Sequence, residues 1–107
     1  MGSCTLLAEF TNTTETNTTL ADNINNYREV LLCRGNGTNT AIDSTSILPV
    51  SVFKTSAALR SKDNSVAGGA YRTYLVQASY VNDTTVSVTT YTDYSPITVN
   101  GYLYGIK

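Results

Sequence analysis

The chain of 107 residues fits one domain, and its net charge of −1 leaves no basic stripe to hold the phosphates of a nucleic acid. Only 14% of the residues are charged, and abundant Thr, Asn and Ser favour strands, turns and hydroxyl-rich surfaces. The charge therefore argues against nucleic-acid binding. The absence of histidine argues against histidine-dependent catalysis, and the absence of an apolar run of bilayer length argues against membrane insertion.

The N-terminus resembles a start added for expression, Met1-Gly2-Ser3, and residues 4–107 form the predicted domain. We expect no signal peptide, because neither a basic segment nor a long apolar stretch follows Met1. The only cysteines are Cys4 and Cys33. They suit either a disulfide or two buried thiols, and the thiols are the preferred interpretation. Two cysteines without histidine do not complete a metal site, so no metal and no cofactor is expected.

In chain order, the first strand is predicted at residues 5–10. The Thr/Asn tract at residues 11–19 suits either a loop or a half-exposed strand. Turn-forming Asn and Asp fill residues 20–26, and residues 27–33 form the strongest early strand. The alternative is a helix over residues 20–33, which the Asn pairs and the lack of a 3.6-residue apolar stripe disfavour.

The middle of the chain is predicted to be the least regular part. Residues 34–39 are rich in Gly and Asn and predict a loop. Residues 47–54 form a strand that Pro49 interrupts, which places it at a sheet edge or a strand start. Residues 55–70 lack a period and predict a mobile surface loop, with one helical turn at residues 57–60.

The C-terminal third has the clearest strand pattern. Residues 71–80 alternate with period two, and residues 84–91 follow with Val86 and Val88 on one face. The alternation of the first of these strands places on one face Tyr74, Val76, Ala78 and Tyr80.

The remaining elements are a turn at residues 82–83, a turn at residues 93–96 and a short strand at residues 97–99. Asn100-Gly101 has the composition of a type I′ turn, which leaves residues 102–107 as the last strand. Strands at this spacing, joined by turn residues, predict an all-β fold: a single small antiparallel β-sandwich of jelly-roll-like form.

Several of these segments have a counterpart in a known class of protein. They are the turn run 20–26 entering the strand 27–32, the following Gly/Asn loop, residues 47–50, the Thr-rich strand 84–88 and the closing Tyr-Leu-Tyr-Gly-Ile-Lys. Together, over residues 6–107, they resemble the C-terminal β-sandwich domains of bacteriophage tail fibres and related receptor-binding virion appendage proteins. The resemblance implies a distal, often trimeric fibre module that is made in the host cytoplasm and located in the virion.

No catalytic motif accompanies this resemblance. Among the eight acidic residues, a glycosidase pair remains an alternative, but Asp83 and Asp93 more readily cap turns. Both cysteines lie in predicted strands with no adjacent base, which disfavours a nucleophilic thiol. We therefore expect that the protein is not an enzyme.

Tyrosine is the more suggestive residue type, because its ring stacks on sugars while its hydroxyl forms hydrogen bonds. The candidate ligand-binding residues lie at strand ends, in turns or on the predicted loop; they are Tyr71, Tyr91, Tyr94, Arg60, Lys62 and Asp63. Two tyrosines of the last strand, Tyr102 and Tyr104, are instead predicted to lie at a subunit interface.

The sequence thus suggests a non-enzymatic virion module that forms a homotrimer and attaches to a glycan, or a surface protein, of the host cell. Trimerisation would bury a tyrosine-bearing sheet face that a small monomer leaves exposed. One alternative is a monomeric carbohydrate-binding module of a larger bacterial surface enzyme. Another is a purely structural capsid or fibre domain without a ligand.

Overall fold

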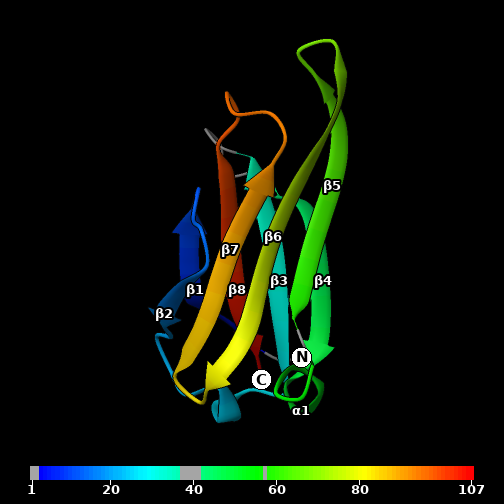
Figure 1. Cartoon of the computed structure of the whole chain (residues 1–107). Helices are drawn as coiled ribbons and strands as arrows, with labels where there is room; N and C mark the ends of the chain where they lie inside the picture. Colours follow the sequence, from blue (N-terminus) through cyan, green and yellow to red (C-terminus); the bar gives the residue numbers. More distant parts are fainter. Residues whose placement is uncertain (1–2, 37–41, 57) are drawn as a thin grey trace.

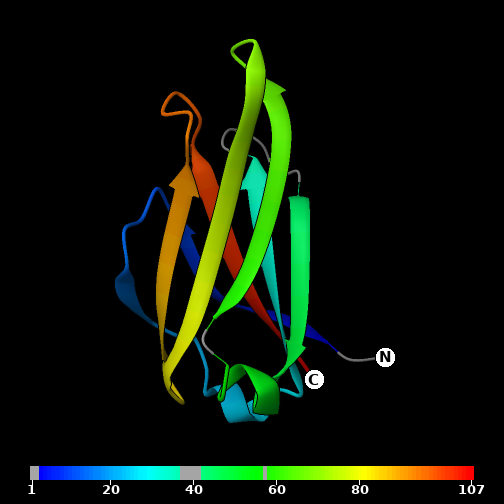
Figure 2. The same ribbon diagram turned by 45° about the vertical axis from the view of Figure 1, so that its right-hand side comes forward.

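The computed structural model describes residues 3–36, 42–56 and 58–107 and shows two antiparallel sheets packed face to face (Figures 1 and 2). The predicted all-β sandwich is confirmed. The strands are β1 (Cys4–Thr11), β2 (Thr16–Thr19), β3 (Glu29–Asn36), β4 (Ile42–Pro49), β5 (Leu59–Ala67), β6 (Ala70–Asn82), β7 (Thr85–Thr92) and β8 (Val99–Ile106). Two short helices, the 3₁₀ helix η1 (Ile24–Asn26) and α1 (Val50–Phe53), lie at the end of the sandwich where Figure 1 marks both chain termini. Within the described ranges, no helix has the length and apolarity needed to cross a membrane.

Each sheet contains four strands. Sheet A has the order β1-β8-β3-β4, and sheet B has the order β2-β7-β6-β5. The first strand pairs with the last, and β2 pairs with β7 in the opposite sheet, so the two ends of the chain are nested across the sandwich. This nesting is the jelly-roll-like part of the topology. The pairs β3–β4 and β5–β6 complete the two sheets on the other side.

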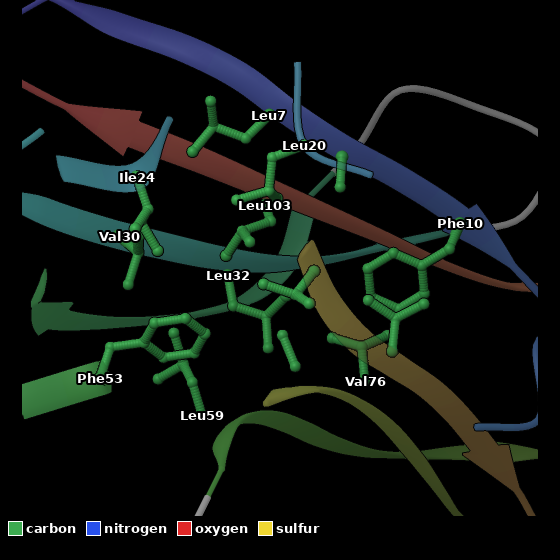
Figure 3. Close-up of a cluster of buried hydrophobic side chains, with 14 of the residues drawn as sticks. Leu7, Phe10, Leu20, Ile24, Val30, Leu32, Phe53, Leu59, Val76 and Leu103 are labelled. Carbon is green, nitrogen blue, oxygen red and sulfur yellow. The ribbon is translucent and has the colours of Figure 1, made fainter. Parts of the chain in front are cut away.

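The core between the sheets is formed mainly by alternate residues of β3, β6, β7 and β8, with further side chains from β1, β5 and the two short helices (Figure 3). Tyr74, Val76 and Ala78 of β6 are buried and Tyr80 packs against them, which confirms the predicted inward face. Val86 and Val88 of β7 are buried as predicted. The buried side chains labelled in Figure 3 are Leu7, Phe10, Leu20, Ile24, Val30, Leu32, Phe53, Leu59, Val76 and Leu103.

Two buried glycines of β8 lie on the core side of the strand, and large aromatic rings occupy the space that a side chain would fill there. A Cβ on Gly101 would overlap the Phe10 ring, and a Cβ on Gly105 would lie 2.5 Å from Cγ of Tyr27. The prediction of a turn at Asn100-Gly101 is therefore wrong: both residues belong to the continuous strand β8. The short strand predicted at residues 97–99 is also wrong, because only Val99 belongs to a strand.

The middle of the chain is more regular than predicted. The stretch 55–70, predicted as a loop, contains the nine-residue strand β5. Pro49 ends β4 and precedes α1, so the predicted strand 47–54 is half strand and half helix. The predicted loop 34–39 begins inside β3, and its residues 37–39 lie outside the described ranges. Residue 57 of the predicted helical turn also lies outside them, and Leu59 and Arg60 are extended.

Both cysteines are free, in agreement with the preferred thiol interpretation, but only Cys33 is buried. Cys4 pairs with Ile106 on one side of β8, whereas Cys33 pairs with Tyr102 on its other side, so the strand β8 separates them. The prediction that both thiols are buried is therefore wrong for Cys4, which lies exposed near the chain end. Burial raises the pKa of the Cys33 thiol, and Cys4 adds to the rise.

Two tyrosine–aspartate hydrogen bonds form locally at the α1 end of the sandwich, one in the segment before β3 and one at the turn between β6 and β7. Tyr27 Oη donates to Asp22 Oδ2 at 2.9 Å, and Tyr80 Oη donates to Asp83 Oδ1 at 2.6 Å. In each pair this hydrogen bond is the largest cause of a carboxyl pKa below the ordinary 3.8. The ionised carboxylates therefore stabilise the folded chain above the ordinary pKa, and this contribution is lost as the pH falls through the lowered value.

Acid should accordingly destabilise the protein partly through these two pairs. We expect the Tyr27→Phe/Tyr80→Phe variant, which keeps both rings, to lose less stability between pH 7 and pH 3 than the unmodified chain. Urea unfolding at the two pH values measures the difference. Equal losses in the two proteins would show that the pairs have no part in acid sensitivity.

Candidate functional site

The outer face of sheet B is polar and hydroxyl-rich, and we call it the polar face. Because Tyr74, Val76 and Ala78 of β6 point inward, the alternate residues Leu75 and Gln77 point outward. Residues directly opposite each other in an antiparallel pair share a face, so the pairing register extends this surface to the neighbouring strands. The polar face thereby comprises Glu15, Arg60, Lys62, Leu75, Gln77, Thr89 and Tyr91.

Two adjacent rows cross this face. In the first row, Arg60 is paired with Gln77 and Gln77 with Thr89; Arg60 Nε donates to Gln77 Oε1 at 2.7 Å. In the second row, Lys62 is paired with Leu75 and Leu75 with Tyr91. The Tyr91 side chain is 53% exposed, so its ring is available at the surface.

A hollow of about 360 Å³ adjoins the first row. Its lining includes Glu15, Gln77, Ser79, Ser87 and Thr89, which offer a carboxylate, an amide and hydroxyl groups. The backbone amide of Glu15 donates to Thr89 Oγ1 at 3.2 Å, and this bond holds the carboxylate-bearing loop against β7. An exposed aromatic ring beside such groups suits a sugar, whose faces are apolar and whose edges carry hydroxyls.

Three of the predicted ligand-binding residues come together on the polar face: Arg60, Lys62 and Tyr91. They do so from strands, since the loop predicted for Arg60 and Lys62 is β5. Tyr71 has the same outward direction but lies four positions along β6 from Leu75, opposite Val66 near the tip of the β5–β6 hairpin. Figure 1 shows this hairpin extending beyond the rest of the sandwich.

Asp63 does not belong to the polar face. It pairs with the inward-facing Tyr74, and its Oδ2 lies 3.4 Å from Nη1 of Arg34. Arg34 is 3% exposed and stacks over the Tyr74 ring at 4.4 Å. Asp63 therefore balances a buried cation, and it lies in the strand β5 instead of the predicted loop.

Tyr94 is also engaged within the fold. The guanidinium of Arg72 stacks over its ring at 4.5 Å, and the hydroxyl and ring edge of Tyr94 fill the space beside Gly68. Gly68 has a φ of +59°, a left-handed conformation that glycine adopts readily. Tyr94 thus braces the β5–β6 hairpin against the loop before β8 rather than joining Tyr91.

The outer face of sheet A is different: it carries Leu6, Leu31, Ile47, Tyr102 and Tyr104, which we call the apolar face, with the exposed Glu9 opposite Tyr102 at its margin. One register row crosses all four strands, from Leu6 through Tyr104 and Leu31 to Ile47. Leu6 is 40% exposed and Ile47 is 50% exposed. Tyr102 lies on the same face over Gly35, and partial burial raises the pKa of Tyr104.

A larger hollow of about 510 Å³ lies between Tyr27, Arg28 and α1. Two of the side chains that line this hollow, Tyr27 and Lys54, already form hydrogen bonds or ion pairs within the fold. The Tyr27 hydroxyl binds Asp22, and Lys54 Nζ donates to Asn25 Oδ1 at 2.7 Å and lies 3.4 Å from Asp83 Oδ1. The polar face, whose tyrosine is exposed, is therefore the better candidate site.

The polar-face residues that the sequence analysis missed are Glu15, Leu75, Gln77 and Thr89. The signal for Leu75 and Gln77 was present, because the correct inward face of β6 dictates which residues point outward. Glu15 is different. Its own φ is +20°, and local sequence does not specify this backbone conformation.

No protein-family profile and no curated protein sequence matches the chain. The sequence resemblance and the geometry of the two outer faces are therefore the basis for a proposed function. Within the described part of the chain, no group of three or more His, Cys, Asp or Glu residues is arranged to hold a metal ion.

Proposed function

We propose that the chain is a non-enzymatic attachment module of a phage virion appendage, such as a distal tail-fibre or receptor-binding domain. In this proposal the polar face binds glycans of the host surface, and the apolar face joins three copies into a homotrimer. The tail-fibre assignment itself rests on the sequence resemblance described above.

The observation that supports this function is the contrast between the two outer faces of one sandwich. An ordinary small sandwich hydrates both outer faces with polar side chains. Here sheet B presents Arg60, Gln77 and Thr89, with Tyr91 beside them, as a glycan site requires. Sheet A presents Leu6, Leu31 and Ile47 in one row, a surface that association of copies would remove from water.

Glycan-array screening of the intact chain tests the binding role. We expect at least one class of surface glycan to bind, and Tyr91→Ala to weaken binding roughly fivefold, since a stacked exposed ring contributes about 1 kcal/mol. Tyr71→Ala is the control, because it removes a tyrosine of the same sheet that is more exposed, 79% against 53% for Tyr91, and that lies four positions along β6 from Leu75. Absence of binding to any glycan would leave only a scaffold role.

A monomeric carbohydrate-binding module of a larger bacterial surface enzyme is the second candidate, because it would use the same polar face. The molecular mass in solution separates the two. The virion proposal predicts the mass of three chains, and the second candidate predicts the mass of one. The apolar row on sheet A favours the virion proposal, since a monomeric module would leave that row in water.

A further inference from the structure

The cations of the polar face lie together on β5. Arg60 and Lys62 are exposed and alternate with the buried Leu59 and Ser61, so they point to the same side, roughly 7 Å apart along the strand. The face therefore has a positively charged edge at β5 and the neutral groups of β6 and β7 next to it.

The Arg60 guanidinium is oriented by a neutral partner. Its Nε donates to the amide oxygen of Gln77 at 2.7 Å, and the Arg60 side chain is exposed. A guanidinium presented in this way matches the two oxygens of a carboxylate.

The neighbouring carboxylates are directed elsewhere. Asp63 on the same strand faces inward to Arg34, and Asp93 accepts a hydrogen bond from the backbone amide of Thr73 at 2.9 Å. Glu15 lies beyond β7, so two strands, β7 and β6, separate it from β5. Among the residues that the structure describes, Arg60 and Lys62 therefore form no ion pair with an acid on this edge of the polar face.

We propose that the ligand of the polar face is an acidic glycan whose carboxylate is bound by Arg60 and Lys62. Its sugar ring lies over Leu75 and Tyr91, and its hydroxyls reach the amide of Gln77 and the hydroxyl of Thr89. This inference rests on the proposed function, because it names the class of glycan for the same site.

Matched pairs of glycans that differ only in charge test the inference. Titration of the intact chain with 3′-sialyllactose and its carboxamide, and with an oligogalacturonate and its methyl ester, measures the preference directly. At least one acidic form should bind about tenfold more tightly than its neutral partner, as expected for hydrogen bonds to a charged group. High salt should reduce that preference.

The variants R60Q and K62Q should abolish the preference for the acidic form and retain the weaker binding of the neutral form. R28Q removes one exposed positive charge outside the polar face and should leave the preference unchanged. Equal affinity for acidic and neutral forms in both pairs would overturn the inference while glycan binding stands. Failure of every glycan on the array to bind would overturn the proposed function with it.

Discussion

Replacing Gly101 with alanine is expected to destabilise the fold by about 2–3 kcal/mol, a large share of the stability of a small domain. The added Cβ would overlap the Phe10 ring, which is 6% exposed and enclosed by the core. The ring cannot move outward without opening the contact between β1 and β8. Urea unfolding of the variant measures the loss.

Gly35→Ala is the matched control, because it adds the same methyl group to a neighbouring strand of sheet A. That Cβ would lie 2.6 Å from Cε2 of Tyr102, whose half-buried ring on the outer surface is free to shift. We expect a loss below about 1 kcal/mol, offset in part by the lower entropy of the unfolded chain. Equal losses for the two variants would contradict the assignment of Gly101 to the packed interior.

The variant Ile47→Lys is expected to convert the proposed homotrimer into monomers. Ile47 is 50% exposed in the single chain, so lysine there leaves the core intact. In a trimer that covers the apolar face, each chain would bury an unpaired ammonium group at a cost of about 2 kcal/mol or more. Over three chains this amounts to roughly a ten-thousand-fold fall in the association constant.

Sedimentation equilibrium measures this change. Val66→Lys is the control, because it makes a comparable replacement at a 64% exposed position on β5, in sheet B. We expect the control to remain trimeric. A monomeric unmodified chain, or a trimer that tolerates lysine at position 47, would contradict the role of the apolar face.

The strands that the sequence predicted correctly are those whose inward residues are apolar. In β6 the alternation of Tyr74, Val76 and Ala78 with polar residues follows the burial of the strand. In β5 the inward residues include Ser61 and Asp63, because they face Ser44 and Arg34 instead of the apolar core. A strand that covers polar partners has no hydrophobic period, so local sequence could not reveal it.

Asn100-Gly101 shows a second limit of local reasoning. The pair has turn-forming composition, yet Gly101 lies in the strand β8. Glycine is required there because the Phe10 ring of β1 occupies the space of a side chain at position 101. The requirement comes from a residue 91 positions away in the sequence. Such long-range contacts are invisible to turn preferences.

The candidate site was predictable in part. Tyr91, Arg60 and Lys62 were singled out for their chemistry, and the sheet register places them on one face. Tyr94 and Asp63 looked equally suitable, but cation–π contact with Arg72 and the ion pair with Arg34 occupy them. Residue type suggested the candidates, and only the tertiary contacts separated the outward-facing side chains from those that are engaged within the fold.

In the proposed function, the polar face of sheet B binds the host glycan. Amide chemical-shift mapping of the isotope-labelled chain, titrated with the best glycan from the array, tests it most directly. We expect the shifts to concentrate at Arg60, Gln77, Thr89 and Tyr91, while Leu31 and Ile47 on the apolar face stay unchanged. Shifts confined to the apolar face or to the hollow beside α1, with none on β6 and β7, would contradict the claim.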